Sequence, residues 1–342
     1  MDCGLMLARP PEPKERRSGL GRWIFFGTAS ALIASFTPFP AIYEPFMAAM
    51  TVLLAVSFVV AVVDLYRPAA ESEAPASNRL RTREVRDPED VVRFFDALAH
   101  EYRDGHGNAE PALRDRLALI RSLLPDRRSL MVEIGCGNAM HLLALAPLFE
   151  ETVGIDASPK MIAVARAQRA SRDRVRFAVD RAERLSSVAA DSADLVLCVG
   201  AFEHMIDQPA ALTEVARVLR PHGVFVCLSP NEGYVWYAYL APWLGLDTRH
   251  LSTDRFVAPE QWPALLGAAG LEVSALGFWR FVPAGDMPRW AASTMRALDR
   301  IGSMLRIDAL RGGCYVRAVK PPYGPAASSA QAGASTASTS SW

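Results

Sequence analysis

A short apolar stretch that runs into a glycine-rich turn constrains this chain more than any other feature. Residues 130–134 are followed by Gly135, Cys136 and Gly137, then by a helical stretch, a second apolar run and Asp156. This order of strand, turn, helix, strand and carboxylate is typical of the first half of a nucleotide-binding βαβ unit. The glycines let the backbone approach a ligand closely, and the carboxylate suits a ribose diol. The sequence therefore predicts an α/β fold that binds a nucleoside-containing ligand.

Two features of this turn indicate which nucleoside ligand fits. A dinucleotide-binding turn has a third glycine where this chain has Met140, and it cradles a pyrophosphate. The bulky Met140 side chain therefore disfavours a nicotinamide-dependent oxidoreductase. Glu133, an acid at the end of the first strand, suits a cationic amino-acid ligand. S-adenosylmethionine meets both conditions, because it carries a sulfonium and no phosphate, while an ordinary strand–turn–helix of an unrelated α/β protein stays open as an alternative.

Strands and helices alternate regularly along the central part of the chain. The pattern predicts strands at 130–134, 152–155, 175–179, 195–199 and 224–228, and helices at 139–149, 159–170, 181–189 and 209–219. Two earlier helices are expected, one that starts at Asp87-Pro88 and one at 112–124. Such alternation indicates a mostly parallel sheet with both faces covered, whose ligand site lies at the carboxyl ends of the strands.

Five motifs in this order resemble those of the class I S-adenosylmethionine-dependent methyltransferases. They are EIGCG at 133–137, VGIDAS at 153–158, DLVLC at 194–198, EHM at 203–205 and LRPHG at 219–223. The resemblance is to the branch that methylates quinones, lipids and sugars, and it covers 131–229 closely and 88–320 more loosely. It implies a Rossmann-like doubly wound sheet of about seven strands, completed by edge strands at 273–281 and 315–319. Ala139 stands where the family often has a further glycine, and we expect this small residue to be tolerated.

The resemblance implies S-adenosyl-L-methionine as the cofactor, and it assigns residues to the cofactor site. The expected cofactor-binding residues are Glu133, Gly135, Cys136, Gly137, Asp156, Ala157, Met161, Asp180, Arg181, Ala182, Val199 and Gly200. We expect Asp156 to accept hydrogen bonds from the ribose hydroxyls and Asp180 to meet the adenine edge. For both aspartates the alternative is a helix N-cap, which needs the same residue type.

His204 follows the end of the fourth predicted strand and is the candidate catalytic residue. A histidine is a base near neutral pH, so it could take the proton of a hydroxyl acceptor during methyl transfer. The alternative is a structural histidine held by hydrogen bonds in the loop. Transfer from a sulfonium depends on alignment more than on acid or base, so a catalytic residue is not obligatory. No metal-ligand spacing is evident, and we expect no metal site.

Charge and cysteine content limit the classes of partner and compartment. The formal net charge is zero, and there is no basic domain of the kind that binds nucleic acid. The five cysteines have neither disulfide nor metal-ligand spacing. They are expected to be reduced, buried, small apolar residues of a cytosolic domain. The expected partners are a small-molecule or lipid-linked acceptor and a membrane.

The N-terminal segment is different in kind. Between Trp23 and Val63 the only charged residue is Glu44, and prolines near it divide the run into two apolar stretches of about 20 residues. Arginines flank the pair on both sides, so the positive-inside rule predicts a two-pass hairpin with both termini and the enzyme domain in the cytoplasm. A re-entrant hairpin, a cleaved signal peptide and a buried helix pair are the alternatives.

We therefore expect five regions and one main function. The regions are a cytoplasmic N-terminus (1–20), a transmembrane helical hairpin (21–66), a linker (67–86), a methyltransferase domain (87–320) and a disordered tail (321–342). Two segments, 233–246 and 287–310, could cover the acceptor or lie in a membrane interface, or could simply cap the core. The expected function is methyl transfer to a lipidic or lipid-linked small molecule at the cytoplasmic face of a membrane. The alternative is a non-catalytic, membrane-tethered S-adenosylmethionine-binding or scaffold protein.

Overall fold

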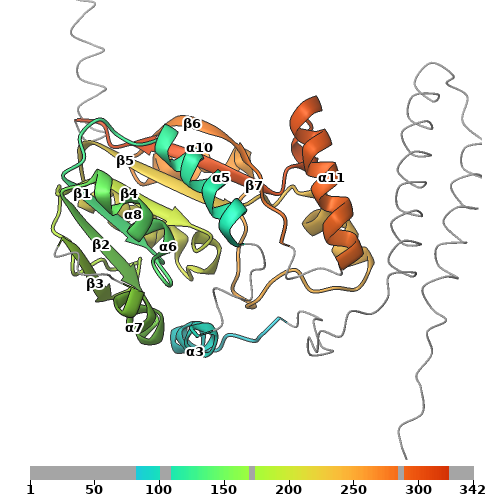
Figure 1. Cartoon of the computed structure of the whole chain (residues 1–342), viewed down its shortest axis with the longest axis horizontal. Coiled ribbons are helices and arrows are strands. Elements are labelled where there is room, and N and C mark those ends of the chain that lie inside the picture. The colour runs from blue at the N-terminus through green and yellow to red at the C-terminus, as the bar shows by residue number, and fades with distance from the viewer. Residues whose placement is uncertain (1–81, 101–108, 169–173, 284–288, 323–342) are drawn as a thin grey trace, which may run out of the picture. The chain divides into compact units, whose positions relative to one another are not determined.

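The computed structural model describes residues 82–100, 109–168, 174–283 and 289–322 (Figure 1). The chain divides between Ser72 and Glu73 into two units, and all of the described residues belong to the second. The hairpin predicted at 21–66, most of the linker and most of the C-terminal tail lie outside the described residues. Within the described ranges, no helix is both long enough and apolar enough to cross a bilayer.

A seven-stranded sheet in the order β3-β2-β1-β4-β5-β7-β6 forms the centre of the described unit. Its strands are β1 (Leu130–Ile134), β2 (Glu151–Asp156), β3 (Val175–Val179), β4 (Ala193–Val199), β5 (Leu219–Pro230), β6 (Glu272–Trp279) and β7 (Gly313–Val319). Strands β1 to β5 pair in parallel, and β7 runs antiparallel to both β5 and β6. The predicted Rossmann-like sheet with two added edge strands is confirmed. The strand order reverses between β1 and β4, which is where ligands bind in such sheets.

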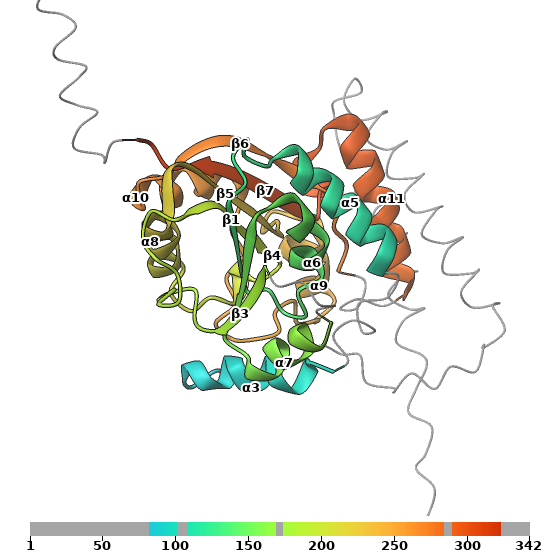
Figure 2. The same cartoon turned by 60° about the vertical axis from the view of Figure 1, so that its left-hand side comes forward.

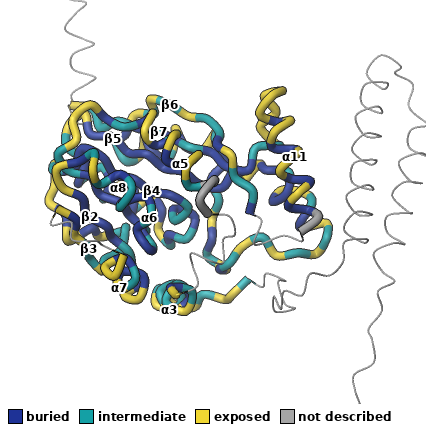
Figure 3. The backbone as a smooth tube through the Cα atoms, in the orientation of Figure 1, coloured by how far each residue is buried: buried dark blue, intermediate teal, exposed yellow. Residues whose placement is uncertain are grey.

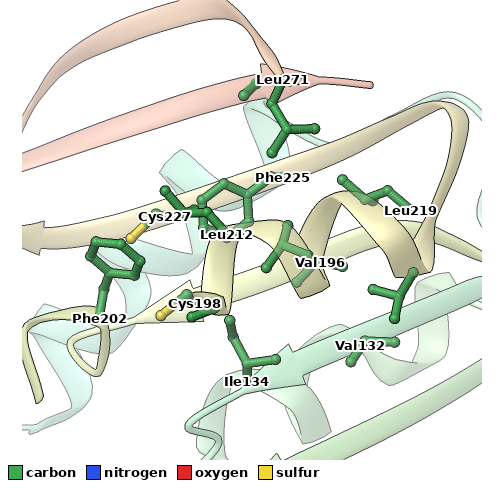
Figure 4. Close-up of a cluster of buried hydrophobic side chains, with 14 of the residues drawn as sticks. Val132, Ile134, Val196, Cys198, Phe202, Leu212, Leu219, Phe225, Cys227 and Leu271 are labelled. Carbon is green, nitrogen blue, oxygen red and sulfur yellow. The ribbon is translucent and has the colours of Figure 1, made fainter. Parts of the chain in front are cut away.

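Alternate residues of the central strands point to opposite faces and build two separate cores. Val132, Val196 and Phe225 belong to one cluster, which packs against α8 (Gln208–Val218) and α10 (Trp262–Ala268) (Figure 4). Their neighbours Met131 and Leu195 belong to the other, which packs against α5 (Ala109–Ser122) and α6 (Met140–Leu145). Figure 3 shows the central strands β1, β4 and β5 as mostly buried and the edge strand β6 as partly exposed. Burial on both faces explains why these strands are nearly uninterrupted apolar runs in the sequence.

The remaining helices stand at the ends and edges of the sheet. They are α3 (Pro88–Leu98), η1 (Ala146–Leu148), α7 (Pro159–Gln168), η2 (Phe202–His204), η3 (Trp236–Leu240), α9 (Ala241–Trp243), η4 (Pro259–Gln261), α11 (Arg289–Leu305) and η6 (Asp308–Leu310). The predicted helix start at Asp87 is confirmed. The Asp87 side chain accepts from the Asp90 N–H, the Asp90 carboxylate accepts from the Asp87 N–H, and Pro88 occupies the first turn.

The helix predicted at 181–189 is wrong. These residues form successive turns that connect β3 to β4. Asp180 accepts from the Arg181 N–H at 2.8 Å, from the Ser187 N–H at 3.1 Å and from the Ser186 hydroxyl at 2.9 Å. Leu185 has φ +38°, outside the range of a right-handed helix. The side-chain hydrogen bonds of Asp180 thus satisfy backbone donors that a helix would otherwise use.

The helix predicted at 139–149 is shorter in the structure. Ala139 has φ +62° and stands before the first residue of α6 as its N-cap. The α-helix ends at Leu145, and a 3-10 turn that contains Pro147 follows. Ala139 thus holds the left-handed conformation that a glycine adopts without strain. This is the position where the sequence departs from the family pattern.

A third apolar cluster joins the segments after β5 and after β6. Tyr234, Trp236 and Tyr237 pack with Met295 and Leu298 of α11. In the same helix α11, the Asp299 carboxylate lies 3.4 Å from the guanidinium of Arg311. The two segments predicted to cover the acceptor or to cap the core therefore pack against each other as one cap.

Candidate functional site

A pocket opens at the carboxyl ends of the central strands, where the sheet topology predicts a ligand site. It encloses about 750 Å³ of empty space, which includes solvent at its open mouth. Its lining residues are Pro88, Val91, Val92, Phe95, Gly135, Gly137, Asp156, Ala157, Met161, Asp180, Arg181, Ala182, Glu183, Gly200, Ala201, His204, Met205 and Ile206. The structure therefore brings together nine of the predicted cofactor-binding residues and the candidate catalytic His204.

The glycine turn after β1 forms the floor of the pocket. Gly135 has φ +63°, and a Cβ there would lie 2.3 Å from the Cβ of Ala201. Gly137 has φ +51°, and its N–H donates to Asp156 at 2.8 Å. Gly200 has φ +59° with open space where a Cβ would stand. Only glycine combines these dihedral angles with a floor this close to the ligand space.

Asp156 ends β2 and reaches from the second strand to the glycine turn. One carboxylate oxygen accepts from the Gly137 N–H and the other from the Ser158 N–H, each at 2.8 Å. Burial raises the pKa of Asp156, although these two hydrogen bonds act in the opposite direction. Each carboxylate oxygen has a second lone pair, so the side chain can still accept from two ligand hydroxyls. Asp156 is not the N-cap of α7, because Ser158 holds that position and its hydroxyl accepts from the Met161 N–H at 3.0 Å.

Asp180 directly follows β3 and lines the same pocket. Burial alone would raise the pKa of Asp180, but hydrogen bonds from Arg181, Ser186 and Ser187 outweigh it and lower the pKa. The carboxylate is therefore ionised at neutral pH and ready to accept a hydrogen bond from an amino group. Ala157, Met161 and Ala182 supply apolar surface on the same side of the pocket.

Three predicted cofactor residues do not line the pocket. Cys136 and Val199 are buried, and burial raises the pKa of the Cys136 thiol. Glu133 is buried behind the turn, where one carboxylate oxygen lies 3.4 Å from Nδ1 of His141. Its other oxygen has no hydrogen-bond partner among the described residues. A buried carboxylate oxygen without a partner costs free energy, and a ligand donor that reached it would remove this cost.

Helix α3 forms the roof of the pocket. The sequence did not show which of its residues face the ligand. Pro88, Val91, Val92 and Phe95 face the cavity. Asp96 ties the helix to α7, since its carboxylate accepts from the Ser158 hydroxyl at 2.5 Å and from the Lys160 N–H at 3.1 Å. Figures 1 and 2 both show α3 beside α7. Residues 94–102 resemble the N-terminal helix of the family branch, and this resemblance was the signal that the helix lies over the cofactor.

His204 stands at the other end of the pocket, just after β4. Its Nδ1 lies 2.8 Å from a carboxylate oxygen of Asp254, and the Phe95 ring is 5.1 Å away. Asp254 comes 50 residues later in the chain, and no motif around it marks it in the sequence. Glu203, the neighbour of His204, is buried, and burial raises the pKa of its carboxyl. Ala201, Met205 and Ile206 complete an apolar wall around the histidine.

The polar groups of the pocket fit an adenosine-type ligand with a positive centre. The lining carboxylates are Asp156, Asp180 and Glu183, against the single guanidinium of Arg181. Gly137, whose N–H could face a phosphate, donates to Asp156 instead. Acids at the ends of β2 and β3, a glycine floor and an unpaired buried oxygen on Glu133 suit S-adenosylmethionine, and they do not form a pyrophosphate cradle.

Comparisons with known proteins agree with this geometry. Residues 132–227 match the family model described as a methyltransferase domain. The chain is 30% identical to the ubiquinone biosynthesis O-methyltransferase of Azorhizobium caulinodans over 231 residues, which cover 61% of this chain and 90% of that protein. It is 28% identical to the protein of the same name from Xanthomonas axonopodis pv. citri, across 58% of this chain and 87% of that relative.

Among solved structures, the crystal structure of the [4+2]-cyclase SpnF is similar to this chain. It has a TM-score of 0.53 at 18% sequence identity and covers 70% of this chain and 99% of its own. At this identity the likeness concerns the fold alone.

Proposed function

Because the chain belongs to the class I S-adenosylmethionine-dependent methyltransferases, we propose that it methylates a hydroxyl group on an apolar, quinone-like or otherwise lipid-like small molecule. The observation that carries this proposal is the two-sided pocket. One side holds the strand-end carboxylates Asp156 and Asp180, and the other holds His204 in an apolar wall. The curated relatives are named O-methyltransferases of ubiquinone biosynthesis, which favours an oxygen on a quinone precursor as the acceptor atom.

The cofactor side of the pocket has a defined task for each residue. S-adenosylmethionine supplies a methyl group bonded to a positively charged sulfur. In our proposal Asp156 accepts from the ribose hydroxyls, Asp180 accepts from the adenine amino group, and Met161 packs on the ring. The glycine turn holds the methionine part, and the unpaired oxygen of Glu133 accepts from its ammonium group. Gly200 leaves open space beside the position of the methyl group.

The acceptor side of the pocket orients a ring and excludes water. Phe95 from α3 and Met205 and Ile206 after β4 present apolar surface around His204. An aromatic acceptor packed on this surface would direct a hydroxyl toward the cofactor, and alignment of this kind is the main source of rate in methyl transfer. His204 is the one ionisable group on this wall and the candidate for the acceptor's proton.

We also propose that the enzyme works at the cytoplasmic face of a membrane, held there by the hairpin at 21–66. Exposed apolar side chains on the cap support this part of the proposal. Tyr239 and Trp243 are 68% and 52% exposed, and Met304 and Leu305 at the end of α11 are 74% and 58% exposed. Arg300 and Arg306 are exposed beside them. Apolar residues flanked by arginine are typical of a surface that lies in a lipid interface.

Calorimetry with S-adenosylhomocysteine tests the cofactor assignment, with NADH as a comparison ligand. We expect the full-length protein in detergent to bind S-adenosylhomocysteine and not NADH. Asp156→Ala should weaken binding at least about tenfold, because a hydrogen-bonded carboxylate contributes about 1.5–3 kcal/mol. Glu150→Ala, at an exposed carboxyl away from the pocket lining, is the control and should bind normally. A folded protein without affinity for S-adenosylhomocysteine would refute the proposed function.

A further inference from the structure

The carboxylate of Asp254 contacts His204 and also accepts hydrogen bonds from the backbone. Its side chain is 0% exposed. One oxygen lies 2.8 Å from Nδ1 of His204, while the other accepts from the His250 N–H at 3.0 Å and the Leu251 N–H at 2.9 Å. Two backbone donors on one oxygen fix the orientation of the carboxylate. The oxygen that faces His204 is therefore fixed as an acceptor.

The loop that carries Asp254 is itself tied to the start of the described unit. The Arg83 N–H donates to the His250 carbonyl and the Ser252 N–H donates to the Arg83 carbonyl, each at 2.9 Å. The Val85 N–H adds a hydrogen bond of 2.9 Å to the Ser252 hydroxyl. Residues 82–85, which we call the strap, thus pair with the loop as a short parallel bridge. A loop held on both sides can keep a buried carboxylate in place.

A carboxylate that only accepts determines the state of the histidine. Because Asp254 offers no hydrogen, Nδ1 of His204 must be the donor, and in the neutral ring the lone pair then lies on Nε2. His204 lines the pocket, with the Phe95 ring 5.1 Å from its own. The charged or titratable groups near the ring include Asp254, the neighbouring Glu203, and His250, whose ring lies 6.0 Å away.

We propose that Asp254 is a positioning residue that holds His204 in the Nδ1–H tautomer, so that Nε2 serves as the general base for a hydroxyl acceptor. This inference rests on the proposed function and deepens it. The acceptor oxygen forms a bond to the methyl carbon as the carbon–sulfur bond breaks and leaves its electron pair on sulfur. The hydroxyl proton passes to Nε2, and the carboxylate of Asp254 stabilises the imidazolium that results.

The substitution Asp254→Asn tests the tautomer directly. The two backbone N–H groups of His250 and Leu251 must still find an acceptor, so the amide oxygen turns toward them and the NH₂ group faces Nδ1. Nδ1 then accepts a hydrogen bond from the amide, and the ring carries its proton on Nε2. A protonated Nε2 has no lone pair with which to take the proton of the acceptor. Imidazole ¹H–¹⁵N spectra of the full-length protein with S-adenosylhomocysteine should show Nδ1–H for wild type and Nε2–H for the variant. The His204 signal is assigned with His204→Gln.

The rate of methyl transfer should depend on which ring nitrogen of His204 carries the proton. The matched acceptor probes are 4-octylcatechol and its 5-nitro derivative. Asp254→Asn should lower kcat for octylcatechol about 100-fold or more, while the acceptor KM and the Kd of S-adenosylhomocysteine change less than about twofold. The nitro derivative has a hydroxyl that is acidic enough to ionise without a base. For this acceptor, Asp254→Asn should lower kcat by less than about tenfold. Asp126→Asn, at an exposed aspartate that does not line the pocket, is the control and should keep the wild-type rate.

Each outcome separates this inference from the proposed function. Failure of the wild-type protein to bind S-adenosylhomocysteine would refute the function itself. Normal binding with wild-type His204 protonated at Nε2 would overturn the role of Asp254 alone, and this readout does not require any variant to fold. An Asp254→Asn variant with a wild-type rate, or with equal losses for both acceptors, would overturn it as well.

Discussion

At the scale of single residues, two glycines of the pocket share a backbone conformation but differ in the space around them. Gly135 and Gly200 both have φ near +60°, at +63° and +59°. A Cβ at Gly135 would meet the Cβ of Ala201 at 2.3 Å, whereas a Cβ at Gly200 would enter open pocket space. The two positions therefore separate backbone strain from steric overlap.

Gly135→Ala and Gly200→Ala should lower stability by different amounts and both weaken cofactor binding. A left-handed alanine costs about 1–2 kcal/mol, and overlap with Ala201 adds about 1–3 kcal/mol at position 135 only. Urea unfolding should therefore show the larger loss for Gly135→Ala. Calorimetry should show that the better-folded Gly200→Ala still binds S-adenosylhomocysteine poorly, because its new methyl group occupies ligand space. Equal losses of stability would contradict the steric argument.

Glu203 gives the fold a dependence on pH. Burial raises the pKa of Glu203, and the charge of His204 only partly opposes this. Below the ordinary pKa of the unfolded chain the carboxyl is neutral in both states, so it costs nothing. As the pH rises through the folded-state pKa, the buried group must ionise and the wild-type protein loses stability.

Glu203→Gln removes this cost without changing the size of the side chain. The melting temperature of the variant minus that of wild type should increase from pH 4.5 to pH 8, by about 2–4 °C for each kcal/mol. Glu150→Gln, at an exposed carboxyl, should give a difference that does not change with pH. A difference that does not change with pH would mean that the pKa of Glu203 is the same in the folded and the unfolded chain.

At the scale of elements, the pocket depends on how α3 is held over the sheet. Asp96 bonds to the Ser158 hydroxyl and the Lys160 N–H at the start of α7. Asp96→Ala should therefore loosen the roof and weaken S-adenosylhomocysteine binding roughly tenfold, about 1.4 kcal/mol, with little change in melting temperature. Glu89→Gln, on the exposed side of the same helix, is the control. Hydrogen exchange should rise in α3 of the Asp96 variant, and unchanged exchange would contradict this role.

The parallel strands could be predicted from the sequence and the connections between them could not. Strands buried on both faces are continuous apolar runs, so β1 and β3 match their predicted bounds and the others differ by a few residues. Residues 181–189 were wrongly predicted as a helix because the prediction uses only the spacing of apolar residues. That spacing contains no information about the hydrogen bonds that Asp180 makes with the backbone. Asp254 could not be found, since its contact with His204 joins residues far apart in the chain.

At the scale of the whole molecule, the proposed membrane hairpin has a direct test. Full-length protein expressed in cells should stay in the membrane pellet after washing with alkaline carbonate or with high salt, because a two-pass apolar hairpin is held by the bilayer core. A protein that starts at Arg79 should leave the pellet under high salt, since only surface contacts of the cap would hold it. Release of the full-length protein by carbonate would refute the two-pass insertion.

The strap has a consequence for how far such an enzyme could reach. It fixes the chain at Thr82 beside the loop that carries Asp254. With the proposed hairpin ending at residue 66, a fully extended connection could span at most about 55 Å. The tether would be attached next to the catalytic pocket instead of at the far edge of the domain.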